Sequence, residues 1–263
     1  MFDFFNSKET ICIVRNRVAV LNVMVDVVTM QEAVHAVEEF IALKKTHMVF
    51  TPNAEMIMMA HSDPQLAQIL NHADLVVPDG AGVVWAARYN GHNMPERVAG
   101  YDLVQNLLKK AATKKYRIYM LGGAPGIVEK AKSAAERRYP GVEIVGTHNG
   151  FFAKDDELGI INHIKACKPD ILLVALGVPR QEKWIAEFVQ QMQVPVAIGV
   201  GGTFDVMSGT VRRAPLWMQN AKLEWMYRLL SDPKRAGRML ALPRFVMQVR
   251  AKKRSKKIII EKI

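Results

Sequence analysis

Short apolar segments alternate with amphipathic helical patterns through most of this chain, and that alternation limits the folds open to it. Between residues 117 and 200, four short and mainly apolar segments are separated by three helical patterns. Strands that are apolar on both faces over most of their length are typical of parallel sheets buried on both faces. The sequence therefore predicts an α/β fold, namely a Rossmann-like and mostly parallel sheet with helices on both faces.

The first half of the chain has the same rhythm in a less regular form. It opens with a strand or short hairpin over 18–28. The expected strands that follow cover 47–50, 74–77, 117–121, 142–147, 170–176 and 194–200. The expected helices cover 30–45, a stretch after Pro52, a stretch from Asp63-Pro64, 81–89, 101–113, 125–138, 155–167 and 180–191.

The pattern changes after Gly209, where two helices and no strands are expected, over 215–230 and 234–250. We expect an α/β core over 1–208 and a basic helical appendage over 209–263, for which the family resemblance described below implies association with a membrane. Leu216, Trp217 and Trp225 fall on the face of the first helix that we expect to pack.

All of the excess positive charge lies in that C-terminal segment. Of 36 Lys and Arg in the chain, 15 fall in residues 209–263, against the three acids Glu224, Asp232 and Glu261, so the segment carries +12 and the rest of the chain −1. A basic segment of this kind favours contact with a polyanion such as anionic lipid, nucleic acid or a diphosphate, although a solvated terminus has the same composition.

Several protein classes are disfavoured by what the sequence lacks. Cys12 and Cys167 are far apart and outside any Cys/His cluster, so a disulfide framework or a structural zinc site is not expected. We also expect no signal peptide at the N-terminus and no membrane-spanning helix, because no apolar run reaches about 18 residues.

Polar and glycine residues follow five of the expected strands. In an open parallel sheet, ligands bind outside the carboxyl ends of the strands, so these residues are candidates for one polar site. They are Thr51 and Asn53, Asp79 and Gly80, Gly122 and Gly123, the segment 177–181 with Gln181, and the segment 201–205 with Gly201, Gly202 and Asp205.

Two of these turns are rich in glycine and fit a diphosphate. Gly122-Gly123 opens an expected helix, and 199–205 is a second loop of the same type. Glycines let backbone N–H groups approach a phosphate at a helix N-terminus, although a purely structural turn has the same pattern.

Asp79 is the best candidate for proton chemistry, because a carboxylate at a strand end can act as general base toward a sugar hydroxyl. The alternative is an N-cap for the helix near Ala81, and Thr51 and Asn53 likewise have a capping alternative. Arg97 is a candidate phosphate clamp or a partner of Glu96. Gln181 is a candidate sugar ligand or a solvent-facing residue.

The sequence contains no Asp-x-Asp motif and no cluster with metal-ligand spacing, so we expect neither a metal nor a cofactor. Arginines and helix N-termini would then stabilise a departing diphosphate.

A series of short segments in a fixed order resembles the WecG/TagA/CpsF glycosyltransferases over residues 18 to 245. The segments are Thr51-Pro52-Asn53, Pro78-Asp79-Gly80, 96–102 (ERVAGYD), Leu121-Gly122-Gly123, 177–184 (GVPRQEKW), 199–205 (GVGGTFD), Arg213-Ala214-Pro215, Glu224-Trp225, Tyr227-Arg228-Leu229 and Leu242-Pro243.

That resemblance implies an inverting, metal-independent transfer of a sugar from a UDP donor to an undecaprenyl-diphosphate-linked sugar. In the wall teichoic acid branch, N-acetylmannosamine is transferred to N-acetylglucosamine. The resemblance further implies a peripheral enzyme on the cytoplasmic face of the plasma membrane, with Asp79 as catalytic base. It gives Thr51, Asn53, Arg97 and Gln181 a role in shaping the site, and Arg228, Arg235 and Arg238 a role in closing over the diphosphate.

Two alternatives remain open at this stage. The same fold transfers other UDP-sugars, such as N-acetylmannosaminuronic acid or glucose, in enterobacterial antigen, capsule or exopolysaccharide synthesis. A nucleic-acid-binding protein with a basic tail is a different class, disfavoured because the appendage aromatics fall on the expected packing face. A homo-oligomer is compatible with the sequence, which does not determine the oligomeric state.

Overall fold

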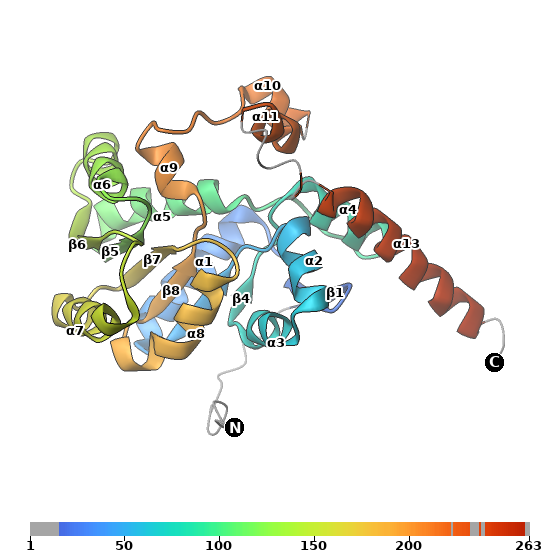
Figure 1. The fold of residues 1–263 in the computed structure, drawn as a ribbon, viewed down its shortest axis with the longest axis horizontal. Helices are drawn as coiled ribbons and strands as arrows, with labels where there is room; N and C mark the ends of the chain where they lie inside the picture. The colour runs from blue at the N-terminus through green and yellow to red at the C-terminus, as the bar shows by residue number, and fades with distance from the viewer. Residues whose placement is uncertain (1–15, 222, 232–236, 238–239, 261–263) are drawn as a thin grey trace.

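A six-stranded sheet forms the centre of the molecule (Figure 1). The structure is a computed structural model that describes residues 16–221, 223–231, 237 and 240–260. The strands run in the order β4 (Leu75–Val76), β3 (His47–Phe50), β8 (Val196–Gly199), β7 (Ile171–Ala175), β5 (Arg117–Gly122) and β6 (Glu143–His148). Every neighbouring pair is parallel, which confirms the predicted Rossmann-like sheet.

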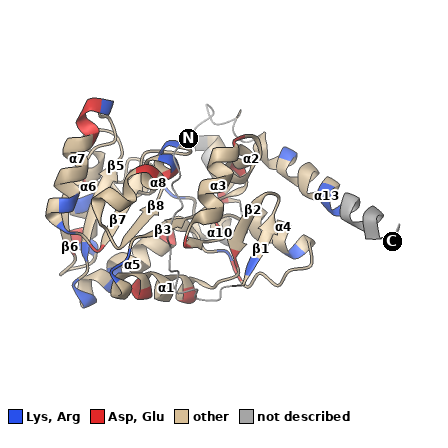
Figure 2. Ribbon diagram, turned by 90° about the horizontal axis from the view of Figure 1, so that it is seen from below, with Lys and Arg blue, Asp and Glu red and all other residues tan. Residues whose placement is uncertain are grey.

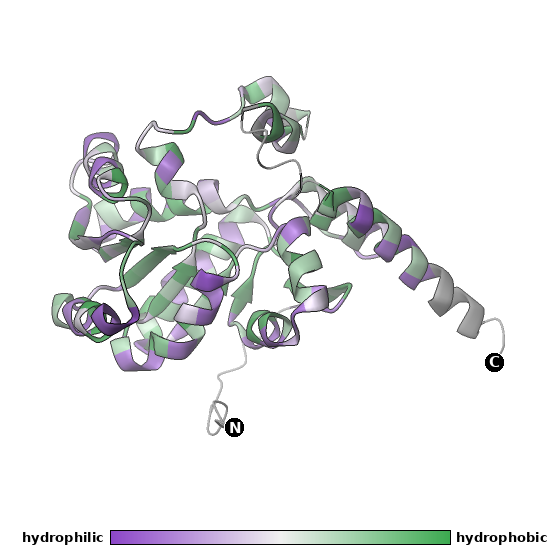
Figure 3. Cartoon of the chain, viewed as in Figure 1, coloured by the Kyte–Doolittle hydropathy of each residue, from purple (hydrophilic) through white to green (hydrophobic). Residues whose placement is uncertain are grey.

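Helices cover both faces of the sheet, because alternate residues of each strand point to opposite sides. Leu172 and Val174 of β7 join one apolar core, and Ile171 and Leu173 join the other. The first core contains α2 (Ala54–Ser62), α3 (Pro64–His72), α4 (Ala81–Tyr89), α7 (Glu157–Cys167) and α8 (Arg180–Met192). The second contains α1 (Met30–Leu43), α5 (Gly100–Lys114), α6 (Ile127–Arg138) and the short α9 (Thr203–Met207). In Figure 3 the central strands are coloured as hydrophobic, as burial on both faces requires.

The helix starts follow local sequence signals in most places. Thr29 and Glu32 form a capping box at α1, and Asp63 caps α3 with Pro64 in its first turn. The expected start of a helix at Pro125 is wrong. Gly126 has a φ of 80°, outside the right-handed helical region, so α6 begins after it, at Ile127, and Pro125 stays in the turn. A 3-10 turn, Lys154–Asp156, precedes α7.

The predicted N-terminal hairpin is present and is fastened to the edge of the sheet. It comprises β1 (Arg17–Val20) and β2 (Val23–Asp26) in an antiparallel pair. The fully buried Asp26 carboxylate accepts the N–H of Val76 in β4 at 2.7 Å and the Nε of Arg17 at 3.1 Å. The hairpin therefore covers the outer edge strand, which would otherwise present backbone groups for pairing.

The C-terminal segment differs from its expected layout. In place of one helix over 215–230 there are two, α10 (Leu216–Asn220) and α11 (Glu224–Ser231). Between them the N–H of Leu223 donates to the carbonyl of Met218 at 2.8 Å, a five-residue step that interrupts the helical pattern.

The second expected helix, over 234–250, has the wrong bounds, because the structure places α13 over Ala241–Ile260. Pro243 is the third residue of α13, a position where the missing N–H costs nothing because no helical carbonyl precedes it. The stretch 232–236 lies outside the described residues. No helix among the described residues is long and apolar enough to cross a bilayer.

The two parts of this segment meet the core differently. The first half of α13 packs on α2 and α4, where Phe245 and Val249 are buried in the apolar core. The other half projects beyond α4, and α10 and α11 stand together away from the sheet (Figure 1). Of the three surfaces on which the apolar face of the appendage could pack, namely the core, a neighbouring subunit or lipid, the core does not cover Leu216, Trp217 and Trp225, which are 74%, 65% and 42% exposed.

Candidate active site

Three adjacent strands, β4, β3 and β8, bring the predicted site residues together at their carboxyl ends. Thr51 follows β3, and its Oγ1 lies 3.5 Å from the carbonyl of Gly199 in β8. Gly100, the first residue of α5, packs so closely on Thr51 that a Cβ there would lie 2.9 Å from Oγ1. A Cβ at Gly80, after β4, would lie 3.6 Å from that of Asn53. These loops therefore form one continuous surface.

Asp79 precedes Gly80 on this surface, and its side chain is 23% exposed. The N-cap of α4 is Gly80, at a φ of 86° that favours glycine, so Asp79 is not the capping residue. The Oδ1 atom of Asp79 is 3.5 Å from the Nε of Arg97. A half-buried carboxylate beside a fixed cation suits a group that takes a proton from a ligand.

The capping alternative is confirmed for Asn53 but not for Thr51. The Oδ1 of Asn53 accepts the N–H of Met56 at 3.0 Å and starts α2, while Thr51 and Pro52 precede the helix. The cap uses only the side-chain oxygen of Asn53, and the side-chain nitrogen of Asn53 is a separate hydrogen-bond donor. Capping fixes the Asn53 side chain beside Gly80, and hence beside the loop that carries Asp79.

Arg97 joins two carboxylates, and neither belongs to Glu96. Besides Asp79, it forms an ion pair through its NH2 group with Glu224 of α11. Glu96 instead accepts the N–H of Met30 at 2.5 Å. Burial favours loss of the proton from Arg97, but Asp79 and Glu224 outweigh it and raise the pKa of the guanidinium, so Arg97 stays charged.

Arg213 extends this arrangement and was not singled out from the sequence. It binds Asp102 through two parallel contacts of 2.6 and 2.8 Å and Glu224 through its Nε at 3.2 Å. Its guanidinium also lies 4.7 Å from the ring centroid of Tyr101. We call Asp79, Arg97, Glu224, Arg213 and Asp102 the charge cluster. Three of its members, Glu224, Arg213 and Asp102, were not predicted as site residues. All three lie within the segments that carry the family resemblance, and that was the signal from which they could have been found.

Gln181 does not face solvent: it is buried beneath the loop after β8. Its Oε1 accepts the N–H of Gly201 at 3.1 Å, and its Nε2 donates to Glu182 at 2.7 Å. Glu182 is fully buried, and burial raises the pKa of its carboxyl to about 7. Gln181 therefore fixes the 199–202 loop, and Glu182, which the sequence did not suggest, fixes Gln181.

The two glycine-rich turns have different surroundings. Gly122 has a φ of 127°, and a Cβ there would lie 2.3 Å from the carbonyl oxygen of Ala175. The N–H of Gly123 already donates to that carbonyl at 3.0 Å, so close strand packing accounts for this turn. Gly201 and Gly202 follow β8, next to Thr51, and Asp205 lies in the first turn of α9. Of the two turns, the second is part of the Asp79 surface.

The remaining predicted arginines are placed only in part. Arg228 lies in α11, the helix that carries Glu224, while Arg235 and Arg238 lie outside the described residues. In the described part of the chain, no group of three or more His, Cys, Asp or Glu is placed to hold a metal ion.

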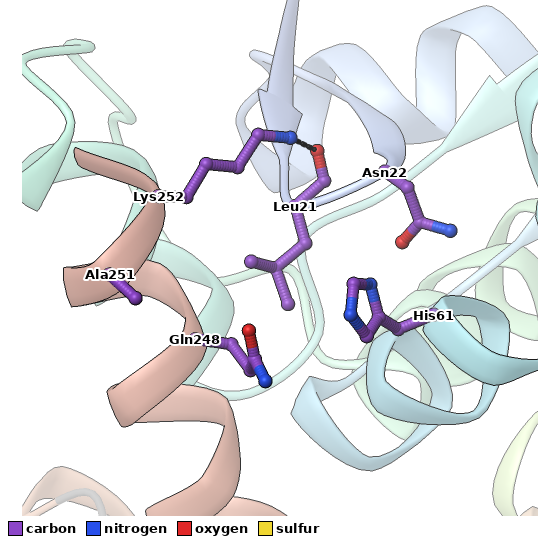
Figure 4. A pocket seen from close by; sticks show the side chains of 6 residues that line it. All are labelled: Leu21, Asn22, His61, Gln248, Ala251 and Lys252. Carbon is purple, nitrogen blue, oxygen red and sulfur yellow. Dashed lines mark hydrogen bonds between the residues drawn. The ribbon is translucent and has the colours of Figure 1, made fainter. Parts of the chain in front are cut away.

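A separate cavity of about 310 Å³ lies at the other end of α2 from Asn53 (Figure 4). Leu21, Asn22, His61 and Lys252 contribute to its lining, and the ammonium of Lys252 donates to the carbonyl of Leu21 at 2.5 Å. The cavity lies outside the carboxyl edge where the charge cluster sits, so we place the candidate site at the cluster.

Comparison with known proteins identifies the family of the chain. The model of the Glycosyl transferase WecG/TagA/CpsF family matches residues 18–258. The chain belongs to that family. Because the match runs from the hairpin into α13, the family unit includes both the sheet and the C-terminal helices.

Named relatives of this glycosyltransferase cover most of its length. A protein of Bacillus spizizenii is 38% identical over 82% of this chain and 83% of its own. One of Bacillus subtilis is 35% identical over 86% and 87%, and one of Staphylococcus aureus is 34% identical over 92% and 95%. Each is named N-acetylglucosaminyldiphosphoundecaprenol N-acetyl-beta-D-mannosaminyltransferase.

Proposed function

We propose that this glycosyltransferase transfers N-acetylmannosamine from UDP-N-acetylmannosamine to N-acetylglucosamine on undecaprenyl diphosphate, which forms the linkage unit of wall teichoic acid. The observation that carries the proposal is the extended match to relatives of that name, at 34–38% identity over at least 82% of this chain. The position of Asp79 at the carboxyl edge of β4, in contact with Arg97, supports it independently.

In the proposed reaction, Asp79 is the general base. A hydroxyl oxygen of the acceptor sugar attacks the anomeric carbon of the donor and forms the new C–O bond. The bond between that carbon and the diphosphate oxygen breaks, UDP leaves with the electron pair, and the hydroxyl proton passes to the Asp79 carboxylate. Attack from the face opposite the leaving group inverts the anomeric centre.

Arginines stabilise the departing diphosphate in this proposal. Arg97 already lies beside Asp79 and keeps its charge. Arg228, Arg235 and Arg238 come from the C-terminal segment, and the loop with Gly201, Gly202 and Asp205 borders the donor. Fixed cations and backbone N–H groups stabilise developing negative charge most strongly where water is excluded. The sequence has no Asp-x-Asp pair, so we expect turnover without a divalent metal.

The acceptor is a lipid, and we propose that the C-terminal segment docks the enzyme on the anionic cytoplasmic face of the membrane. Leu216, Trp217 and Leu230 expose apolar side chains on α10 and α11, and basic residues recur along α13 (Figure 2). Exposed tryptophans partition into the membrane interface, and each Lys or Arg near an anionic surface contributes about 1 kcal/mol.

The deciding experiment measures UDP release from UDP-N-acetylmannosamine with a lipid-diphosphate-N-acetylglucosamine acceptor, in the presence of EDTA. The wild type should turn over at the same rate with and without EDTA. Replacing the base, Asp79→Asn, should lower kcat by roughly 10²- to 10⁴-fold, the usual contribution of general-base catalysis. The exposed Asp155, replaced by Asn, is a matched control that should retain full activity.

The other outcomes are equally informative. Full activity of Asp79→Asn would remove the base from the mechanism. If the wild type released no UDP from this donor but did so from UDP-N-acetylmannosaminuronic acid or UDP-glucose, the proposed donor would be wrong and the family assignment would stand.

A further inference from the structure

Glu224 is an acid that the basic C-terminal segment places in the candidate site. The segment 209–263 holds only three acidic residues among 15 Lys and Arg. One of the three, Glu224 at the start of α11, is 6% exposed and lies against residues of the core. A buried carboxylate is costly unless it is paired, so its partners indicate its role.

Those partners are the two guanidinium groups of the charge cluster. One carboxylate oxygen of Glu224 pairs with the NH2 of Arg97, and the other accepts from the Nε of Arg213 at 3.2 Å. Arg213 is held from its far side by Asp102, through contacts of 2.6 and 2.8 Å. Arg213 and Glu224 come from the C-terminal segment, whereas Asp102 and Arg97 come from the core. Glu224 is therefore fixed on two sides and fixes Arg97 in turn.

The contact with Glu224 determines what Arg97 can do at Asp79. The Nε of Arg97 lies 3.5 Å from Oδ1 of Asp79, and among the described residues this buried Nε has no hydrogen-bond partner, while the NH2 of Arg97 is held by Glu224. Without Glu224, the same guanidinium can present two N–H groups to Asp79 in the stronger bidentate arrangement. Such a pair would neutralise the Asp79 carboxylate and remove the cation from the diphosphate.

We propose that Glu224 is a positioning residue for sugar transfer, which holds Arg97 in a one-point contact with Asp79 so that the carboxylate remains available as a base. This inference rests on the proposed function. It assigns the C-terminal segment a contribution to the chemistry that is separate from its arginines and from membrane docking.

The expected signature is a change in kcat and in its pH dependence. The charged groups that face Arg97 are Asp79, Glu224 and Arg213, and Asp102 holds Arg213. Removing the charge of Glu224 leaves Asp79 more strongly paired with Arg97, which stabilises the Asp79 carboxylate. The acidic limb of the pH–rate profile therefore moves to lower pH, and the maximal rate falls. A role confined to folding would lower the amount of active enzyme without moving the limb.

The test uses full-length wild type, Glu224→Gln, Glu224→Asp and a control, Glu38→Gln. Glu38 is a half-buried carboxylate that pairs with Lys110 at 3.3 Å between α1 and α5, away from the cluster. UDP release is measured across roughly pH 5 to 9, and we expect Glu224→Gln to lower kcat about tenfold or more with a smaller change in KM, since positioning losses act on the chemical step. Glu224→Asp keeps the charge and should recover part of the loss, and Glu38→Gln should match the wild type.

A second readout follows Arg97 without requiring activity. The Nε–H signal of Arg97 in ¹⁵N-labelled full-length protein, assigned by its disappearance in Arg97→Lys, should be broadened or shifted in Glu224→Gln and unchanged in Glu38→Gln. An unchanged signal, or a kcat within twofold of the wild type, would overturn the inference and leave the proposed function intact. A wild type that releases no UDP, together with a changed Arg97 signal, would overturn the proposed function while confirming that Glu224 holds Arg97.

Discussion

Glu182 is a carboxylic acid surrounded by protein on all sides. Burial raises the pKa of its carboxyl from the ordinary 4.5 to about 7, partly offset by the hydrogen bond from Gln181. The folded state therefore binds this proton more tightly than the unfolded chain does. Its contribution to stability is complete below about pH 4.5 and is lost as the pH rises through about 7.

Replacing Glu182 by Gln should remove that pH dependence and keep the hydrogen bond with Gln181. We expect the loss of unfolding free energy between pH 5 and pH 8 to be smaller in the variant by on the order of 3 kcal/mol. Denaturant unfolding at the two pH values measures the difference. The exposed Glu187 of the same helix, replaced by Gln, is the control. Equal pH dependence in Glu182→Gln and the wild type would show that burial does not raise the pKa of Glu182.

For individual residues, the sequence identified the side chains at the strand ends but not the side chains with which they form ion pairs. Asp79 and Thr51 are recognisable because an apolar strand stops beside them. The pairing of Arg97 with Glu224 is not recognisable, because the two are far apart in the chain and their contact depends on the path of the segment 208–223. The adjacent Glu96 was the obvious local partner, and tertiary structure overrides that proximity.

At the scale of the elements, α13 joins the apolar core through Phe245 and Val249. Its Phe245 is 1% exposed and lies against Gly82, where a Cβ would be 3.8 Å from the ring. Gly82 belongs to α4, which begins directly after Asp79-Gly80. The helix α13 also packs on α2, whose N-cap is Asn53. The helix therefore supports two of the loops that carry the candidate site.

Phe245→Ala should open a cavity under α13 and destabilise the protein by about 3 kcal/mol or more, as large-to-small changes in a core do. Hydrogen exchange should accelerate along residues 241–253 and at the start of α4, and much less in β7 and β8. Met247, which is 62% exposed on the same helix, provides the matched variant Met247→Ala, with an effect below about 0.5 kcal/mol. Similar exchange in the two variants would contradict an anchoring role for Phe245.

Element boundaries were predicted well where local signals decide them and poorly where distant contacts do. The strand over 47–50 and the helix over 81–89 match β3 and α4 residue for residue. The stretch 215–230 reads as one helix because its apolar spacing is continuous, yet it breaks before Glu224, the residue that turns to Arg97 and Arg213. The late start of α13 follows from Pro243, which belongs in a first turn and not in the interior of a helix.

At the scale of the whole molecule, the α/β core and the C-terminal segment differ in net charge, which is −1 for residues 1–208 and +12 for residues 209–263. The apolar side chains of Leu216, Trp217, Trp225 and Leu230 on α10 and α11 are exposed, and the excess positive charge of the chain lies in the same segment. Nucleic-acid binding was disfavoured from the sequence because the aromatic residues of this segment fall on the face expected to pack. That argument does not hold for Trp217 and Trp225, which are exposed. Family membership instead favours a lipid surface as the polyanion.

Membrane association should depend on the exposed tryptophans and on the lipid charge. Trp217→Ser should weaken binding to vesicles that contain anionic lipid about tenfold, since interfacial affinity scales with buried apolar area, and neutral vesicles should bind the wild type poorly. Co-sedimentation at low and high salt measures both effects. Phe151, 74% exposed on the core, gives the control Phe151→Ser. Equal losses in the two variants, or retention on neutral vesicles, would count against docking by this segment.

The order of residues in the charge cluster has a consequence for how the enzyme is made. Synthesis on the ribosome proceeds from the N-terminus, and domains begin to fold as they emerge. All six strands of the sheet, with Asp79 and Arg97, precede Gly209, whereas Arg213 and Glu224 follow it. The nascent sheet thus emerges with Arg97 beside Asp79 before Glu224 arrives. The charge cluster therefore becomes complete only after all six strands of the sheet have been synthesised.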